Sequence, residues 1–270
     1  MRMVWAFLCL SVFWVTSSVP VLSNDRKFTY TYESSVLAPG LREIELWNTH
    51  RSGKNYFFRR IDQRLEYEFG VANNLMSALY MNYSWRFMDS NGSAAGGDGV
   101  TSYSMSISNE WKLKLADRVA DAVGFSLYGE ATLGLDETEL EGKIILDKQF
   151  GDVLLAFNAV AEQEWETGPQ NGVSVTKSEF KGEFDFGVAY SVNPEFSFGL
   201  EVRNHNVIVD GDLEHSALFA GPVIAYTSTT WWATLTVLPQ LKGLKGATEN
   251  GLNLDEYEKV EARLLFSFHL

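Results

Sequence analysis

The chain closes on VEARLLFSFHL, residues 260–270, and this stretch decides the fold. Every second side chain in it is apolar, at Val260, Ala262, Leu264, Phe266, Phe268 and Leu270. The positions between them are polar, with Leu265 as the one exception. A period of two is typical of a β-strand with one apolar and one polar face. The strand therefore needs an apolar environment on one side only.

The same alternation recurs along the chain, in residues 75–87, 179–190, 196–206 and 231–241. A helix would place Glu183 on the same face as Phe184 and Phe186, so the strand interpretation is favoured. Between Arg42 and Leu270 we count about twelve such runs, each long enough for the roughly 9–11 tilted residues that cross a bilayer. We therefore expect an all-β chain of about twelve antiparallel strands.

Composition excludes several classes of protein. Hydrophobic residues make up 46% of the chain and aromatic residues 14%, which argues against global disorder. The net charge of -13 argues against nucleic acid as a partner. The single cysteine, Cys9, excludes a domain stapled by internal disulfides.

Residues 1–23 are predicted to be a secretory signal peptide. Arg2 precedes an apolar run at residues 4–15, and Val21 and Ser23 suit a cleavage site before Asn24. The alternative is an uncleaved anchor, but the run is shorter than the roughly 20 residues of a membrane-spanning helix. Residues 24–41 would then be an N-terminal segment, and residues 42–270 a barrel. The stretch 28–36 leaves three options open: a periplasmic strand, a short plug, or part of the first spanning strand.

The connections between the runs alternate in length. Polar or glycine-rich stretches at 89–99, 167–176, 208–215 and 242–256 predict long loops, and 70–74, 150–152, 192–195 and 227–230 predict short turns. Long loops on one side and short turns on the other are typical of a bacterial outer-membrane β-barrel, an up-and-down antiparallel barrel. A soluble β-sandwich is the alternative. Expected partners are outer-membrane lipid and lipopolysaccharide, and no nucleic acid.

Two further sets of residues fit a barrel. The closing strand is similar to the signal that barrel-assembly machinery recognises, carried here by Val260, Leu264, Phe266, Phe268 and Leu270. Aromatic residues near the predicted strand ends are candidates for the two interfacial girdles of a membrane barrel. These candidates are Trp85, Trp165, Trp231, Tyr190 and Tyr257.

If the apolar faces contact lipid, the opposite faces line the lumen, and many of their residues are charged. The lumen candidates are Arg60, Arg64, Glu66, Lys112, Glu130, Lys143, Glu162, Glu164, Lys181, Glu183, Glu201, Arg203, His205, Glu261 and Arg263. This density implies water or mutual ion pairs. We expect a passive channel or small-solute uptake porin whose net acidic lumen favours cations or neutral polar solutes. The alternative is a structural or surface-interaction barrel whose lumen is closed by ion pairs.

Signals for chemistry are weak. A barrel hydrolase would need a serine beside a histidine. His215 and Ser216 are adjacent and would point to opposite faces of a strand, so no catalytic residue is assigned. No metal site or cofactor is predicted, because residues 89–100 lack the glutamate that closes a calcium loop.

Several stretches resemble a family of uncharacterised outer-membrane β-barrel proteins of Gram-negative bacteria, a domain of unknown function. They are REIELWNTHRSGK (42–54), RLEYEFGVANNLMSALYMNY (64–83), ELEGKIILDKQFG (139–151), AFNAVAEQEWE (156–166), GLEVRNH (199–205), EHSALFAGPVIAY (214–226) and WWATLTVLPQL (231–241). The resemblance implies export and an outer-membrane barrel, with no established activity. The chain is more loosely similar to transporter-type barrels for hydrophobic substrates. We therefore also expect a small polar or hydrophobic solute as a partner.

Overall fold

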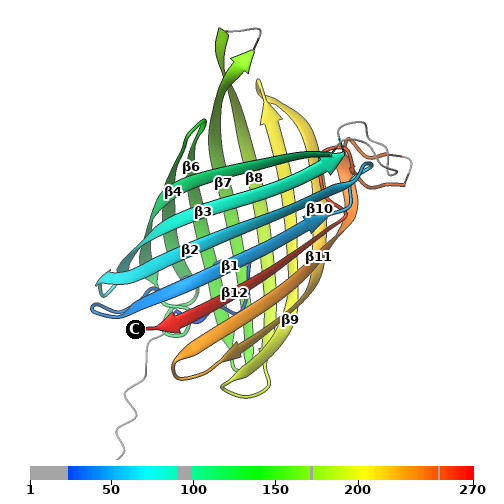
Figure 1. Ribbon diagram of the computed structural model, residues 1–270. Helices are drawn as coiled ribbons and strands as arrows, with labels where there is room; N and C mark the ends of the chain where they lie inside the picture. Colours follow the sequence, from blue (N-terminus) through cyan, green and yellow to red (C-terminus); the bar gives the residue numbers. More distant parts are fainter. Residues whose placement is uncertain (1–23, 90–98, 171–172, 249) are drawn as a thin grey trace, which may run out of the picture.

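The computed structural model describes residues 24–89, 99–170, 173–248 and 250–270. Its strands form one closed antiparallel barrel in which each strand pairs with its neighbours in sequence, and β1 pairs with β12 to close the ring (Figure 1). The strands are β1 (Arg42–Ser52), β2 (Phe58–Ala72), β3 (Leu75–Asp89), β4 (Gly99–Ala116), β5 (Gly124–Gly134), β6 (Glu137–Phe150), β7 (Val153–Gln170), β8 (Val173–Ser191), β9 (Phe196–Val209), β10 (Asp212–Thr227), β11 (Trp231–Lys245) and β12 (Val260–His269). The predicted twelve-stranded barrel is confirmed.

The period of two explains which face points outward. On β3, Leu79 and Met81 are 54% and 53% exposed, whereas the alternate residues Ala78 and Tyr80 are buried. Comparable exposed apolar residues occur on the outer faces of the other strands, so the barrel carries an apolar outer surface. Such a surface suits lipid tails rather than water. Within the described ranges, no helix is long and apolar enough to cross a membrane.

Two predicted long loops are wrong. Paired strands occupy most of 167–176 and 208–215, and the pairing of β7 with β8 continues as far as Gln170 and Val173. Asp210 and Gly211, with φ of 52° and 87°, join β9 to β10. The left-handed region that both residues adopt matches a tight hairpin turn. Glycine, proline and polar residues are frequent at these strand ends although backbone pairing continues, which is why they resembled loops.

The barrel has two unlike ends. We call the end where β1 begins and β12 finishes the terminal end, and the opposite one the distal end. Short turns close the terminal end, including residues 73–74, 151–152 and 192–195. The predicted signal peptide, residues 1–23, lies outside the described residues.

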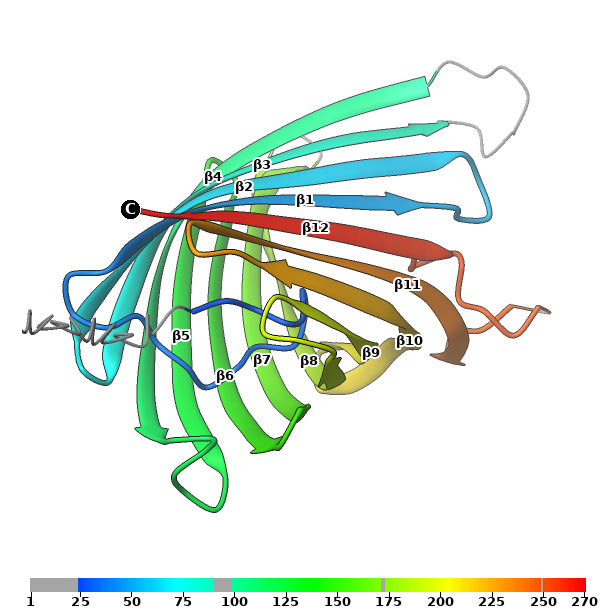
Figure 2. The ribbon, with the colours of Figure 1, turned by 90° about the horizontal axis from the view of Figure 1, so that it is seen from below.

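Residues 24–41, here the inner segment, lie inside the barrel near its terminal end (Figure 2). They form no strand, and their one bridge joins Pro39 to Gly70 of β2. Three aromatic side chains of the segment organise the interior. Phe28 packs with Leu154 and Ala156, Tyr30 with Phe219 and Leu238, and Tyr32 with Trp47, Trp232 and Leu265. Leu265, the exception to the alternation of the closing strand, is thus apolar because it faces this core.

The inner segment crosses the lumen from wall to wall. Its printed contacts reach strands around the ring, including Glu68 on β2, Ser126 on β5, Asn158 on β7, Glu201 on β9 and Thr234 on β11. A single segment can contact all of these strands only by spanning the interior. It therefore fills much of the barrel cross-section at the terminal end.

Candidate functional site

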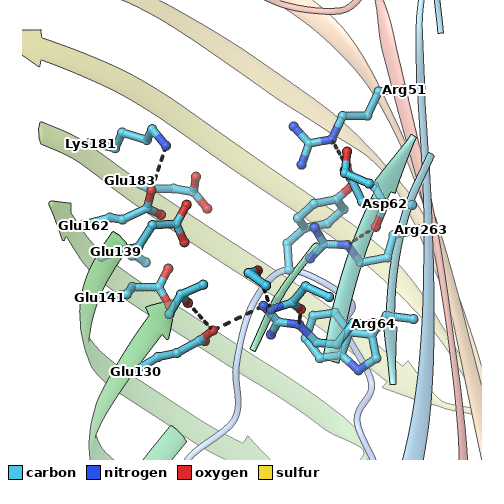
Figure 3. A pocket seen from close by; sticks show the side chains of 18 of the residues that line it. Arg51, Asp62, Arg64, Glu130, Glu139, Glu141, Glu162, Lys181, Glu183 and Arg263 are labelled. Atoms are coloured by element: carbon cyan, nitrogen blue, oxygen red, sulfur yellow. Dashed lines mark hydrogen bonds and ion pairs between the residues drawn. The ribbon is translucent and has the colours of Figure 1, made fainter. Parts of the chain in front are cut away.

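A polar cavity of about 330 Å³ occupies the lumen between the inner segment and the distal end (Figure 3). Tyr30 and Tyr32 of the inner segment line it, so that segment forms its floor. Arg60 near the distal end of β2 and Glu137 at the start of β6 also line it, so the cavity extends toward the distal mouth. The barrel thus holds a pocket with a floor rather than a uniform pore.

The charges on the cavity wall are divided between two sides. Carboxylates gather on β5 to β8, and arginines gather on β1, β2 and β12 across the lumen (Figure 3). The acidic wall comprises Glu130, Glu137, Glu139, Glu141, Glu162 and Glu183, and the arginine wall comprises Arg51, Arg60, Arg64 and Arg263. Opposed walls of unlike charge place an electric field across the cavity, which low-dielectric surroundings strengthen.

Ion pairs within each wall neutralise part of its charge. Lys181 lies 2.7 Å from Glu162, and Lys143 lies 3.0 Å from Glu141. On the arginine side, Arg51 lies 3.1 Å from Asp62. In all, the lining carries seven carboxylates and seven lysine or arginine residues, so the charges balance in number.

The two walls meet at one point. Arg64 Nη2 on β2 lies 3.3 Å from Glu130 Oε1 on β5, and the Arg64 guanidinium stacks over the rings of Tyr80 and Trp47 at 4.2 Å and 4.9 Å. Cation–π contact and a charge-assisted hydrogen bond together hold this arginine across the lumen. The Arg64–Glu130 pair thus links the arginine wall directly to the acidic wall.

Glu201 on β9 anchors the inner segment. Its carboxylate accepts hydrogen bonds from the backbone N–H groups of Thr29, Tyr30 and Thr31 at 2.8–3.1 Å, and from the hydroxyl of Thr236 at 2.5 Å. Successive N–H groups that converge on one anion form a nest. Because Glu201 is fully buried, this contact fixes the middle of the segment to the wall.

Replacing Glu201 with alanine should loosen the inner segment. Hydrogen bonds to a charged group contribute about 1.5–3 kcal/mol each, so we expect at least a roughly tenfold gain in exposure of the segment. Maleimide labelling of a Thr31→Cys reporter would measure it, since the chain's one cysteine lies at position 9. The matched control is Glu195→Ala in an exposed turn, which should not change the labelling rate. Equal rates in all three proteins would contradict the anchor.

The structure places all fifteen lumen candidates inside the barrel. Ten line the cavity: Arg60, Arg64, Glu130, Lys143, Glu162, Lys181, Glu183, Arg203, His205 and Arg263. Glu164 contacts Lys181, and Glu261 lies 3.0 Å from Arg203. Glu66, Lys112 and Glu201 are buried closer to the inner segment.

The closing strand and four of the five girdle aromatics face outward at least in part. Leu264, Phe268 and Leu270 are exposed, and Val260 and Phe266 are half-buried. Tyr190 is exposed, and Trp85, Trp165 and Trp231 are half-buried. Trp231 packs against Phe266 and Tyr226 near the terminal end.

The girdle assignment of Tyr257 is wrong. Its side chain is only 4% exposed, because the loop between β11 and β12 folds inward and packs this ring against Phe219 and His205. The hydroxyl donates to the backbone carbonyl of His205 at 3.2 Å. Burial raises the pKa of the Tyr257 phenol well above its usual value. Tyr257 therefore closes part of the distal mouth instead of contacting an interface.

The one adjacent serine and histidine do not form a nucleophile and base. Ser216 Oγ donates to Asn206 Oδ1 at 2.7 Å, and His215 Nε2 points toward Glu256 at 4.0 Å. Catalysis by this pair would need the hydroxyl to bond the imidazole. The geometry gives no support to hydrolysis at this position.

Sequence reasoning missed two parts of the interior. The inner segment was left with three options, and the acidic residues Glu43 and Glu45 were not named as lumen residues. Both are buried and face inward. The alternation in EIELW (43–47) was the signal that could have indicated them.

Comparison with solved structures supports the fold. An outer-membrane channel from Pseudomonas putida F1 aligns with a TM-score of 0.59 at 11% identity, over 88% of this chain and 98% of that one. The β-domain of the Bordetella autotransporter BrkA aligns with 0.53 at 8% identity, over 86% and 100%. The NanC porin aligns with 0.51 at 12% identity, over 83% and 98%. The chain is therefore similar to outer-membrane channels, porins and autotransporter barrels in fold.

Sequence comparison gives a family but no better-known relative. No curated protein matches the chain. The sequence profile of a family of unknown function (DUF6662) matches residues 20–270, which includes every strand of the barrel. The chain therefore belongs to the DUF6662 family.

Proposed function

We propose that the protein is an outer-membrane uptake channel for small zwitterionic solutes, which carry one positive and one negative group. The observation that carries the proposal is the divided cavity, with carboxylates on β5 to β8 facing arginines on β1, β2 and β12. A zwitterion can direct its cationic group to one wall and its anionic group to the other. A solute with a single charge is attracted by one wall and repelled by the other.

The balance of charge supports a zwitterion over the cation that the acidic composition suggested. Seven carboxylates and seven basic side chains line the cavity, so its wall has no acidic excess. The volume, about 330 Å³, is at the small end of the roughly 300–1,000 Å³ of ligand pockets. Compact solutes such as amino acids or betaines suit it better than oligomers.

The inner segment would act as the gate of this channel. It forms the floor of the cavity and joins no β-sheet along most of its length, so it can move without breaking the barrel. Passage from the distal to the terminal end would require its displacement. Export by residues 1–23 and recognition of β12 by barrel-assembly machinery would place the terminal end in the periplasm.

Uptake of glycine betaine into proteoliposomes would test the proposal. The intact protein should transport this zwitterion faster than choline or acetate, which carry one charge each. Glu139→Lys, in the acidic wall, should lower betaine uptake roughly tenfold, the equivalent of about 1.4 kcal/mol. Glu195→Lys makes the same charge change in an exposed turn and is the matched control.

Two outcomes would contradict the proposal. Betaine uptake that is unchanged in Glu139→Lys would show that the divided wall does not select the solute. Absence of any flux, even after removal of the inner segment, would favour the structural barrel with a lumen closed by ion pairs.

A further inference from the structure

Four carboxylates meet on the inner face of β1 and β2, below the cavity. The strand register pairs Glu43 with Glu68 and Glu45 with Glu66, so the two cross-strand pairs lie side by side. All four side chains are almost fully buried, with exposed fractions of 1%, 4%, 0% and 1%. Like charges directly opposite each other destabilise a sheet unless something compensates them.

Protein cations balance this cluster only in part, because the single charge of Arg26 acts on Glu45, Glu66 and Glu68 together. Arg26, the nearest buried arginine, stacks over Tyr32 at 4.0 Å and donates to the Thr29 carbonyl at 3.2 Å. Within the described part of the chain, no salt bridge of 4.0 Å or less reaches Glu45, Glu66 or Glu68. His269 lies 3.7 Å from Glu43, but it is closer to Asp25, at 3.1 Å. Buried carboxylates need more positive charge than these side chains supply.

Two oxygens in the cluster have no hydrogen-bond partner in the described structure. They are Glu45 Oε1 and Glu66 Oε2, both buried. The carboxyl of Glu66 lies beside that of Glu68, and Glu45 is paired with Glu66 in the strand register, so both oxygens belong to the same buried group of acids. Buried acceptors without donors are rare, and a bound cation is one explanation for them.

The spacing of the oxygens fits a hard divalent cation. One carboxylate oxygen from each of Glu43, Glu45 and Glu68 lies within 4.8 Å of the other two. A Ca²⁺ ion sits about 2.3–2.6 Å from each oxygen ligand, which permits such oxygen separations. The four side chains offer only oxygen donors, which favour Ca²⁺ or Mg²⁺ over transition metals. Flexible carboxylates in this number suit Ca²⁺ better than the strict octahedron of Mg²⁺.

We propose that Glu43, Glu45, Glu66 and Glu68 form a Ca²⁺ site. The site also contacts the start of the inner segment, because Asn24 Nδ2 donates to Glu68 at 3.1 Å and the Asn24 backbone N–H donates to Glu43 at 3.5 Å. Bound Ca²⁺ would therefore fix the carboxylates that hold Asn24. Calcium would thus favour the docked inner segment.

Terbium luminescence tests the site directly. Trp47 Nε1 donates to Glu45 at 2.8 Å and Trp232 Nε1 donates to Glu43 at 3.1 Å, so excitation of either indole would sensitise Tb³⁺ bound here. The refolded protein, stripped with EGTA in detergent free of lipopolysaccharide, should show Tb³⁺ emission sensitised by tryptophan that saturates on titration. Ca²⁺ should displace it at lower concentration than Mg²⁺.

Variants separate the site from other acids. The double variant Glu45→Gln, Glu66→Gln keeps the shape of both side chains and should weaken Tb³⁺ binding at least tenfold. The single variant Glu66→Gln should weaken it less. Glu195→Gln removes a carboxylate from an exposed turn and should leave binding unchanged. Folding of each protein is first checked on an SDS gel, where a folded barrel changes its mobility when the sample is heated.

Three results would overturn the proposal. They are no sensitised Tb³⁺ in a folded barrel, displacement by Mg²⁺ as readily as by Ca²⁺, and equal binding by the double variant. In the first case, protons or the α-ammonium of a chain cleaved before Asn24 would neutralise the cluster. Failure here would leave the uptake proposal intact, because betaine transport is measured independently.

Discussion

Deletion of residues 25–38 is expected to turn a barrel with small or infrequent currents into one with a steady conductance several times larger. The inner segment crosses the lumen and forms the floor of the cavity. Its removal would leave a polar path from the cavity to the terminal end. Planar-bilayer recordings of the intact and deleted proteins, both checked for folding, would measure the change.

A second variant guards against loss of folding in the deletion. Replacement of Phe28, Tyr30 and Tyr32 with serine keeps the length of the segment but removes the side chain that it contributes to each of the three buried clusters. This variant should also conduct more than the intact protein. Folded proteins whose currents all match the intact barrel would show that the segment does not obstruct the lumen.

Replacement of Arg203 with methionine is expected to lower the free energy of unfolding by about 3–5 kcal/mol. Arg203 on β9 joins Glu183 on β8 at 2.6 Å and Glu261 on β12 at 3.0 Å, and all three are largely buried. Without the guanidinium, two carboxylates would remain in the interior with less compensation. Urea unfolding in detergent micelles, followed by tryptophan fluorescence, would give the difference.

Arg60→Met is the matched control for this prediction. Arg60 pairs with Asp62 at 2.6 Å, but its side chain is 38% exposed near the distal end. An exposed pair contributes about 0–1 kcal/mol, so this loss should be small. Equal destabilisation by the two substitutions would contradict the view that Arg203 is a structural centre of the lumen.

The sequence was sufficient to predict the barrel, because the alternation of apolar and polar residues indicates which face of each strand is apolar. The same parity identified inward-facing residues such as Glu183, Arg203 and Arg263 without a structure. It could not say which of them meet. Arg203 and Glu261 are 58 residues apart in sequence, and only the tilt and closure of the barrel bring them together.

The inner segment could not be placed from sequence for a different reason. Phe28, Tyr30 and Tyr32 alternate with threonines in the sequence. This pattern fits a spanning strand and an extended plug equally well. What distinguishes the two is the nest around Glu201, a residue more than 170 positions later in the chain. The carboxylate cluster depends in the same way on the register of β1 and β2, and the burial of Tyr257 depends on how a loop folds.

The transport that we propose requires that the inner segment close the divided cavity toward the terminal end. A reversible tether tests it most directly. Thr29 and Thr236 both donate their hydroxyls to the same oxygen of Glu201, at 3.3 Å and 2.5 Å, so cysteines at these two positions would lie close together. The measurement is betaine uptake by the Thr29→Cys, Thr236→Cys protein, oxidised and then reduced in the same vesicles. We predict uptake that is blocked when the disulfide holds the segment and restored when the disulfide is reduced. Equal uptake in the two states would contradict the claim.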